Sequence, residues 1–275
     1  MNTCHIIIIG DSQEIYEIPD NSIHLVVTSP PYFNAPFDYK NFYNNYDEFL
    51  EIIRNVAKEL FRVIKEGRIL VLNIDDMLVD GKKYPIVADA TKIFQSVGFN
   101  YRDRIIWKKP DDYLRILKRR EVIYRYPYPM YFYPDNLVES FLIFQKGKFD
   151  YFSVSREKKL MSKIDLQEFN QKKLYMTLWE IRNVMPGASL EKGIAAFPEE
   201  IPYRFIKLFS YVGETVLDPF LGSGTTMKVA RELGRNSIGI EINKSLLLII
   251  KKKIGFKFQK NTKETGDSFF IINRN

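Results

Sequence analysis

Short continuous runs of apolar residues recur along the chain and indicate strands. Runs in which neighbouring positions are all apolar are typical of strands buried on both faces of a parallel sheet. Gly10 and Asp11 close the first run, which reads HIIII. The expected strands span residues 5–9, 22–29, 68–74, 101–109, 139–147, 215–218 and 236–242.

Apolar positions at helical spacing separate several of these runs. In residues 46–66 they recur every three or four positions, and Gly67 follows as a candidate C-cap. The same spacing predicts helices over 84–97 and 198–213. Because strands alternate with helices, we predict an α/β fold with a doubly wound, mostly parallel sheet, in one domain over residues 1–275.

Two long segments lack this regular pattern. Residues 110–138 contain five basic side chains and a group of tyrosines interrupted by prolines, and residues 148–193 are rich in lysine. Long segments without periodicity usually form functional surface rather than core. We expect both segments to be inserted or appended surfaces, and the tail after Gly255 is also weakly patterned.

Composition narrows the class of partner. Lys and Arg number 41 against 34 Asp and Glu, so the net charge of +7 favours an anionic partner such as nucleic acid. The single cysteine, Cys4, excludes a disulfide framework, and with only His5 and His24 we expect no metal site. The apolar run 6–9 is too short to span a membrane, so we expect a soluble protein of the cytoplasm.

A glycine-rich turn follows the strand at 215–218. In the letters DPFLGSGTT, Gly222 and Gly224 allow the backbone to approach a ligand at the start of the next helix. The turn is not a P-loop, because Met227, Lys228 and Val229 stand where that motif needs GK[ST]. Glu241, at the end of the following strand, is suited to accept both hydroxyls of a ribose, which indicates an adenosine-containing ligand.

A second motif, TSPPY at residues 28–32, follows the strand at 22–29. Together with DPFLGSGTT after it, TSPPY resembles the amino-group DNA methyltransferases in their β arrangement, with the catalytic half before the cofactor half. This resemblance implies a Rossmann-like fold that uses S-adenosylmethionine, with an inserted DNA-recognition region. It covers most of the chain.

The resemblance also implies the cofactor-binding residues. Asp11 matches the position that bonds the adenine amino group, although a plain turn-forming aspartate is an alternative reading. Phe197 and Pro198 match the segment that closes over the methionine end, with Ile194 where relatives often have histidine. The residues expected to wrap the methionine part and the ribose are Asp218, Pro219, Phe220, Gly222, Ser223, Gly224, Thr225, Thr226 and Glu241.

Amino-group methylation explains the residue types in TSPPY. An exocyclic amino group is a poor nucleophile, because its lone pair is delocalised into the base. The hydroxyl of Ser29 and the carbonyl of Pro30 can accept its two hydrogens, which favours a pyramidal nitrogen. Pro31 stiffens the turn, and Tyr32 offers a flat face for a base swung out of the duplex.

The segments 110–138 and 148–193 are the expected contacts to double-stranded DNA. Lys118, Arg119, Arg120 and Arg125 are suited to bind phosphates, although a basic run is often only a solvated face. The resemblance implies a role in restriction and modification or in genome marking, with a cognate restriction endonuclease as a possible partner. Either a monomer or a homodimer fits the sequence.

Serine at position 29 favours methylation of cytosine N4, because adenine N6 enzymes of the resembled family mostly carry aspartate there. Adenine N6 stays open as an alternative, as does a non-catalytic DNA-binding protein of the same fold. An RNA or protein amide substrate, usually accompanied by asparagine at this position, is a third alternative. A covalent mechanism at cytosine carbon 5 is disfavoured, because Cys4 precedes a buried strand and has no proline–cysteine context.

Overall fold

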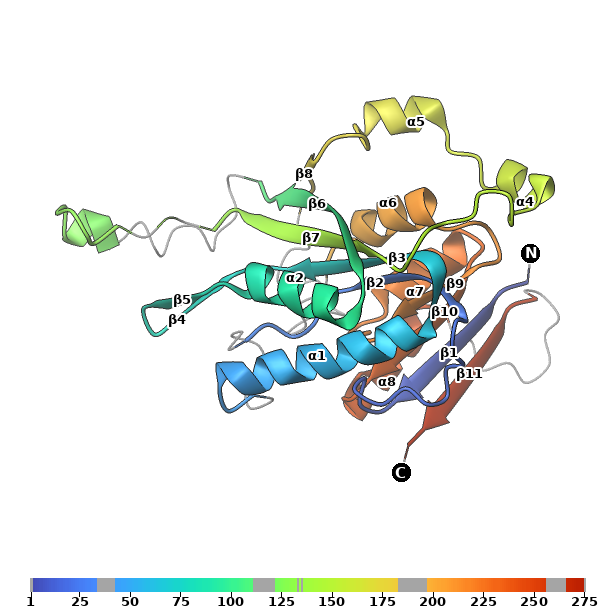
Figure 1. Cartoon of the computed structure of the whole chain (residues 1–275), viewed down its shortest axis with the longest axis horizontal. Helices are drawn as coiled ribbons and strands as arrows, with labels where there is room; N and C mark the ends of the chain where they lie inside the picture. The colour runs from blue at the N-terminus through green and yellow to red at the C-terminus, as the bar shows by residue number, and fades with distance from the viewer. Residues whose placement is uncertain are drawn as a thin grey trace.

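The central feature of the computed structural model is a sheet of parallel strands with one strand reversed (Figure 1). The structure describes residues 2–33, 43–110, 122–132, 134, 136–182, 197–255 and 266–274. Within them, nine strands lie in the order β11-β1-β10-β9-β2-β3-β7-β6-β8. Their bounds are β1 Cys4–Ile9, β2 Ile23–Thr28, β3 Ile64–Ile74, β6 Asn100–Lys108, β7 Val138–Gln145, β8 Leu178–Glu180, β9 Thr215–Asp218, β10 Asn236–Glu241 and β11 Ser268–Asn273. A separate hairpin joins β4, Met77–Val79, to β5, Lys82–Tyr84.

Strand β7 is the reversed one, since it pairs antiparallel with both β3 and β6. The other neighbouring pairs in the sheet are parallel. The prediction of a mostly parallel sheet is therefore confirmed. From β9 the chain continues to β10 on one side, whereas from β2 it continues to β3 on the other. The strand order thus reverses between β9 and β2, which is where open α/β sheets bind ligands.

Helices cover both faces of the sheet, which defines a doubly wound arrangement (Figure 1). Alternate residues of β2 face opposite ways: Val26 packs with the helices α1 and α2, and Leu25 and Val27 pack with α6 and α7. This alternation explains why the strand is apolar at successive positions. The helices are α1 Tyr46–Val63, α2 Ile86–Val97, α4 Arg156–Met161, α5 Leu166–Gln171, α6 Glu200–Phe209, α7 Thr225–Glu232 and α8 Leu247–Lys253, with a short 3₁₀ helix at Lys244–Leu246.

The predicted end of the first helix was wrong. Helix α1 begins after Asn45, whose side chain caps the Glu48 N–H, but it ends at Val63 and not at residue 66. Gly67 lies inside β3 instead of forming a C-cap, and its φ of +81° suits glycine. A Cβ at Gly67 would lie 2.5 Å from the Cα of Phe149. Close approach of another chain segment therefore requires this glycine.

Four further strands escaped the sequence pattern, namely the short hairpin strands β4 and β5 and the strands β8 and β11. Strand β8 lies within 148–193, where we expected only surface, and its Trp179 is 1% exposed. Three residues are too few to show a period, so one aromatic side chain gave no signal. Strand β11 lies in the weakly patterned tail and pairs with β1 at the edge of the sheet, where its Phe270 stays half exposed.

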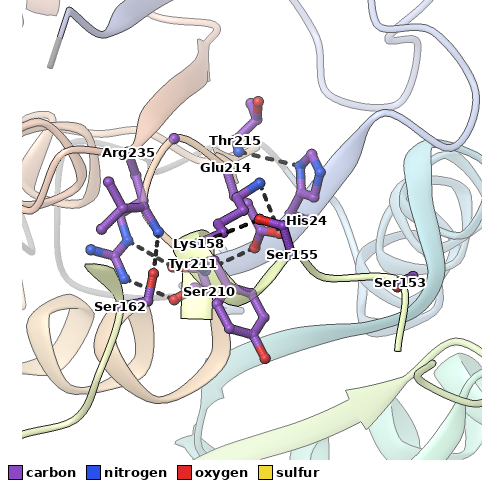
Figure 2. Close-up of polar contacts among 12 residues, drawn as sticks. His24, Ser153, Ser155, Lys158, Ser162, Ser210, Tyr211, Glu214, Thr215 and Arg235 are labelled. Atoms are coloured by element: carbon purple, nitrogen blue, oxygen red, sulfur yellow. Dashed lines mark hydrogen bonds and ion pairs between the residues drawn. The ribbon is translucent and has the colours of Figure 1, made fainter. Parts of the chain in front are cut away.

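The first part of segment 148–182, residues 148–162, is fixed to the domain at the amino ends of the strands, opposite the switch point. Figure 2 shows Lys158 of this segment beside Glu214, which immediately precedes β9. The Glu214 carboxylate is 1% exposed and accepts two hydrogen bonds from Arg68, at 2.6 and 3.1 Å. Lys158 Nζ lies 3.6 Å from the same carboxylate, and the Ser162 hydroxyl accepts from Val212 N at 2.8 Å. These contacts give the segment a defined place on the domain.

Among the described residues, no helix is long and apolar enough to cross a membrane. In the same part of the chain, no group of three His, Cys, Asp or Glu side chains is arranged to hold a metal ion.

Candidate active site

The two sequence motifs meet at the carboxyl edge of the sheet. TSPPY follows β2 and the glycine-rich turn follows β9, and these strands are hydrogen-bonded neighbours. Because β1 and β10 are parallel to them and next in order, Asp11 and Glu241 reach the same edge. The structure therefore brings the predicted catalytic turn and most predicted cofactor residues to one place.

A buried hydrogen bond joins the two motifs directly. The Thr28 hydroxyl donates to Asp218 Oδ1 at 2.7 Å, and the Phe220 N–H donates to the same oxygen at 3.1 Å. Burial raises the pKa of the Asp218 carboxyl to about 6, although hydrogen bonds from Thr28, Thr226 and the Phe220 backbone oppose the shift. Desolvation thus outweighs hydrogen bonding at this carboxyl.

The glycine-rich turn has backbone angles that favour glycine. Gly222 has a φ of +53° and Gly224, the N-cap of α7, has a φ of +90°. Gly239 of β10 lies beneath the turn, and a Cβ there would lie 2.6 Å from both Leu221 methyl carbons. The turn can therefore lie against β10 only because residue 239 has no side chain.

Glu241 organises the turn from the end of β10. Its Oε2 accepts from Gly222 N at 2.8 Å, and its Oε1 accepts from Asn243 N at 2.8 Å. The side chain is buried, which raises its pKa, while the backbone hydrogen bonds lower it. Each carboxylate oxygen keeps lone-pair capacity beyond these bonds.

The first strand contributes a turn beside Glu241. Asp11 is exposed, and its two carboxylate oxygens accept from the backbone N–H and the side-chain amide of Gln13, at 2.9 and 3.0 Å. This is the geometry of a turn-forming aspartate. Ser12 is buried and donates to the carbonyl of Pro219, which fixes the start of the glycine-rich turn.

Phe197 and Pro198 lead into helix α6. Phe197 packs against the core on the α6 face, and Pro198 is buried and accepts from Ile201 N at 3.0 Å. The next residue, Glu199, pairs with Lys228 of α7 at 2.7 Å. This segment is therefore held close to the helix that begins at the glycine-rich turn.

The predicted catalytic turn, TSPPY at residues 28–32, is anchored at its aromatic end. Pro30 is buried, Ser29 is partly exposed, and the Pro31 carbonyl accepts from the Tyr43 hydroxyl at 3.2 Å. The Tyr32 hydroxyl donates to Glu139 Oε2 at 2.8 Å. Burial and then the negative charge of Glu139 raise the pKa of Tyr32 well above its usual value, while a hydrogen bond with Ser29 lowers it.

Three residues that the sequence did not single out complete this part of the site. Asn73, at the end of β3, lies with its Nδ2 at 3.4 Å from Ser29 Oγ and at 2.8 Å from Glu139 Oε2. Lys109, directly after β6, pairs with Glu139 Oε1 at 2.5 Å. The only sequence signal was their position at the ends of the predicted strands 68–74, 101–109 and 139–147.

The predicted DNA contacts are only partly described. Arg125 is exposed in one helical turn at 122–125, and Lys118, Arg119 and Arg120 lie outside the described residues. The same stretch carries exposed aromatic side chains, including Tyr124, which is 75% exposed, and in Figure 1 it projects from the domain at the far left. The carbonyl of Leu137 accepts from Lys109 N at 2.8 Å, so the projecting segment begins and ends at the carboxyl edge.

Solved structures similar to this chain have the same fold. TTHA0409 of Thermus thermophilus, described as a candidate DNA modification methylase and solved with S-adenosyl-L-methionine, is 26% identical. The similarity covers 100% of this chain and 99% of that one, with a TM-score of 0.75. PvuII DNA methyltransferase, described as cytosine-N4-specific, has a TM-score of 0.68 over 96% of this chain and 91% of its own. At 22% identity, the second likeness concerns the fold alone.

Sequence relatives extend over almost the whole chain. M.MjaI, a Type II methyltransferase of Methanocaldococcus jannaschii, is 36% identical over 94% of this chain and 93% of its own length. M.MthZI, a Type II methyltransferase of Methanothermobacter thermautotrophicus, is 32% identical over 92% of this chain and 77% of its own. The model of the N6/N4 DNA methylase family matches residues 23–252, which include both motifs. The chain belongs to the N6/N4 DNA methylase family.

Proposed function

We propose that this protein methylates the N4 amino group of cytosine within a short specific DNA sequence, as the modification enzyme of a restriction-modification system. The observation that carries the proposal is the position of Ser29, which begins the SPPY turn beside the glycine-rich turn at the switch point. Serine in this position favours cytosine in the resembled family. The relatives named as Type II methyltransferases support the restriction-modification role, which implies a cognate endonuclease.

S-adenosylmethionine is the methyl donor, and the carboxyl edge fits it. Gly222 and Gly224 have no side chains and have positive φ angles, which suits close approach of the methionine part to the backbone. Glu241 is buried at the end of β10 and has acceptor capacity for ribose hydroxyls in addition to its two backbone bonds. When bound, this cofactor supplies a methyl group on a positively charged sulfur, which an uncharged nitrogen can attack.

The catalytic turn supplies acceptors for the target amino group. Ser29 Oγ and the Pro30 carbonyl are suited to accept one amino hydrogen each, so that the nitrogen lone pair leaves the plane of the base. Two prolines and the bond from Tyr43 to the Pro31 carbonyl keep the turn rigid. A target inside a duplex is out of reach, so the base must swing out of the stack before it meets this turn.

The segments that flank the edge are proposed to hold the duplex. The projecting segment carries Arg125 and exposed tyrosines, and segment 148–182, which reaches the carboxyl edge at β8, carries exposed lysines such as Lys173. Their basic side chains would bind phosphates, while their aromatic and polar side chains would contact bases. We expect a monomer or a homodimer acting in the cytoplasm.

Adenine N6 is the second candidate target, because the matching family includes both N6 and N4 enzymes. The two are separated by incubating the protein with unmethylated genomic DNA and labelled S-adenosylmethionine, then hydrolysing the DNA and identifying the labelled nucleoside by mass spectrometry. N4-methylcytosine is expected. N6-methyladenine would overturn the base assignment and keep the mechanism, whereas cofactor binding without DNA label would indicate another substrate or a non-catalytic role.

The catalytic assignment is tested with Ser29→Ala. We expect unchanged cofactor affinity and a loss of transfer rate of at least tenfold, because one acceptor for the amino hydrogens is removed. Ser22→Ala is the matched control, since Ser22 donates to the Pro19 carbonyl on the surface near the opposite end of β2. Wild-type turnover in the Ser29 variant would rule out the proposed role.

A further inference from the structure

Glu139 lies at the catalytic turn because β7 is the reversed strand. It is the second residue of β7 and pairs with Trp107 of β6, so it stands at the carboxyl edge of the strands that surround it. Its side chain is only 13% exposed. A carboxylate that is this deeply buried needs hydrogen-bond donors at both oxygens to offset its lost hydration.

Three donors meet this carboxylate. Lys109 Nζ contacts Oε1 at 2.5 Å, and the Tyr32 hydroxyl and Asn73 Nδ2 each contact Oε2 at 2.8 Å. An ionised carboxylate only accepts hydrogen bonds. The hydrogen of the Tyr32 hydroxyl must therefore point at Glu139, and Asn73 must turn its nitrogen toward it.

The orientation of the Asn73 side-chain amide is set by its contact with Glu139. Its Oδ1 is buried and, among the described residues, has no hydrogen-bond partner, although an unsatisfied buried acceptor is destabilising. Turning the amide over would place Oδ1 against the Glu139 carboxylate, oxygen against oxygen. The pairing with Glu139 thus fixes Asn73 with a second N–H hydrogen available for Ser29 Oγ at 3.4 Å.

The donor and acceptor roles of Tyr32 and Asn73 determine which hydrogen bonds the Ser29 oxygen can accept. Because the hydrogen of the Tyr32 hydroxyl points at Glu139, the Tyr32 oxygen can only accept a hydrogen bond on the side that faces Ser29. Asn73 donates to the serine oxygen from another side. One lone pair of Ser29 Oγ is then left to accept a hydrogen from the target.

We propose that Glu139, paired with Lys109, is a positioning residue that directs the hydrogen bonds around Ser29 so that the serine oxygen faces the target amino group as an acceptor. The inference rests on the proposed transfer to an amino group. Glu139, on the reversed strand β7, thus acts on the reaction through Tyr32 and Asn73 and does not itself contact the substrate.

The test is Glu139→Gln. Glutamine has the shape of glutamate, but its amide can donate hydrogen bonds as well as accept them. It therefore no longer forces Tyr32 and Asn73 to act as donors. We expect kcat to fall at least tenfold, with KM for DNA and Kd for S-adenosylmethionine within twofold of the wild type. Glu51→Gln is the matched control, because Glu51 of α1 pairs with Arg54 on the surface at 3.5 Å, away from the proposed binding segments. Thermal unfolding of both variants separates a loss of fold from a loss of rate.

Tyr32→Phe tests whether the effect passes through the phenol. If it does, the double variant Tyr32→Phe/Glu139→Gln loses little more rate than the worse single variant. Independent losses that multiply would overturn the inference, and so would a wild-type kcat in Glu139→Gln or a change confined to KM.

A second readout does not depend on the substrate. With 3-fluorotyrosine placed at residue 32, the ¹⁹F resonance should shift in Glu139→Gln and stay in place in Glu51→Gln. An unmoved resonance in both would overturn the inference even if no DNA were methylated. Methylation of adenine instead of cytosine would contradict the base assignment alone, and the rate ratio of Glu139→Gln to wild type would then be measured on adenine.

Discussion

The hydroxyl of Thr28 donates a 2.7 Å hydrogen bond to Asp218, and this contact joins the last residues of β2 and β9. One residue further along each strand, the catalytic turn and the glycine-rich turn begin. In the proposed reaction, a base held by the first turn and a cofactor held by the second must meet within a narrow distance for methyl transfer. The Thr28–Asp218 bond is the shortest described link between the two binding turns.

Replacing Thr28 by valine should loosen this link. The variant keeps the volume but removes a donor from the buried Asp218, and we expect unfolding free energy to fall by about 1–3 kcal/mol. Thr91→Val is the control, because Thr91 donates to a carbonyl of its own helix, that of Val87. Urea unfolding measures both variants. An equal loss of unfolding free energy in the two variants would show that the Thr28–Asp218 hydrogen bond contributes no more than an ordinary bond within a helix.

The raised pKa of Asp218 predicts a pH dependence of stability. Between its ordinary value of 3.8 and the folded value of about 6, the folded protein holds a proton that the unfolded chain has released. Stability should therefore fall as pH rises through this window, by up to about 3 kcal/mol from this group. Asp218→Asn should flatten the decline and be the more stable protein at pH 7.5.

Urea titrations at pH 4 and 7.5 check this slope. Asp75 is also buried with a pKa raised to about 6 by burial, so part of the decline should remain in the Asp218 variant. Identical slopes in variant and wild type would show that Asp218 ionises normally in the folded protein.

Gly224→Ala should weaken cofactor binding beyond its effect on stability. A left-handed residue other than glycine costs about 1–2 kcal/mol, and the new Cβ would also lie 3.3 Å from Ile250. Gly81→Ala shares the backbone strain, with a φ of +78° but no atom within 4 Å. We expect similar destabilisation of both and at least tenfold weaker S-adenosylmethionine binding only in Gly224→Ala, measured by calorimetry.

Glu241→Ala should weaken cofactor binding more than it destabilises the fold. The change removes a ribose acceptor and also the partner of the Gly222 N–H, so the glycine-rich turn loses its support from β10. At least tenfold weaker binding of S-adenosylmethionine is expected. Glu232→Ala, at the exposed end of α7, is the control and should bind normally. Unchanged affinity in Glu241→Ala would remove Glu241 from the ribose site.

Arg68→Met should strongly destabilise the domain at the opposite edge of the sheet. It leaves the buried Glu214 without its two-pronged partner, and breaking such a pair typically costs about 3–5 kcal/mol. Arg54→Met, which breaks a surface pair with Glu51 at 3.5 Å, should change the unfolding free energy little. A small effect of Arg68→Met would mean that Lys158 alone compensates the Glu214 charge.

The parts of the fold that were predictable are those with a local signal. Apolar runs gave the central strands, and SPPY and DPFLGSGTT placed two turns correctly, because each turn type needs particular residues at consecutive positions. Strand β8 and the Gly67 contact with Phe149 depend on segments far apart in sequence, so no window of neighbouring residues contains them. Glu139 shows the same limit at the site, since its partners come from β2, β3 and the end of β6.

The position of β1 in the sheet has a consequence for how the protein matures. Its paired neighbours are β10 and β11, and contacts such as that of His5 with Ser237 join residues 232 positions apart. During synthesis β1 emerges from the ribosome before β10 and β11, so it has no sheet partner until those strands have followed. Formation of the sheet must therefore be completed late, and the apolar strand HIIII is a natural binding site for chaperones in the interval.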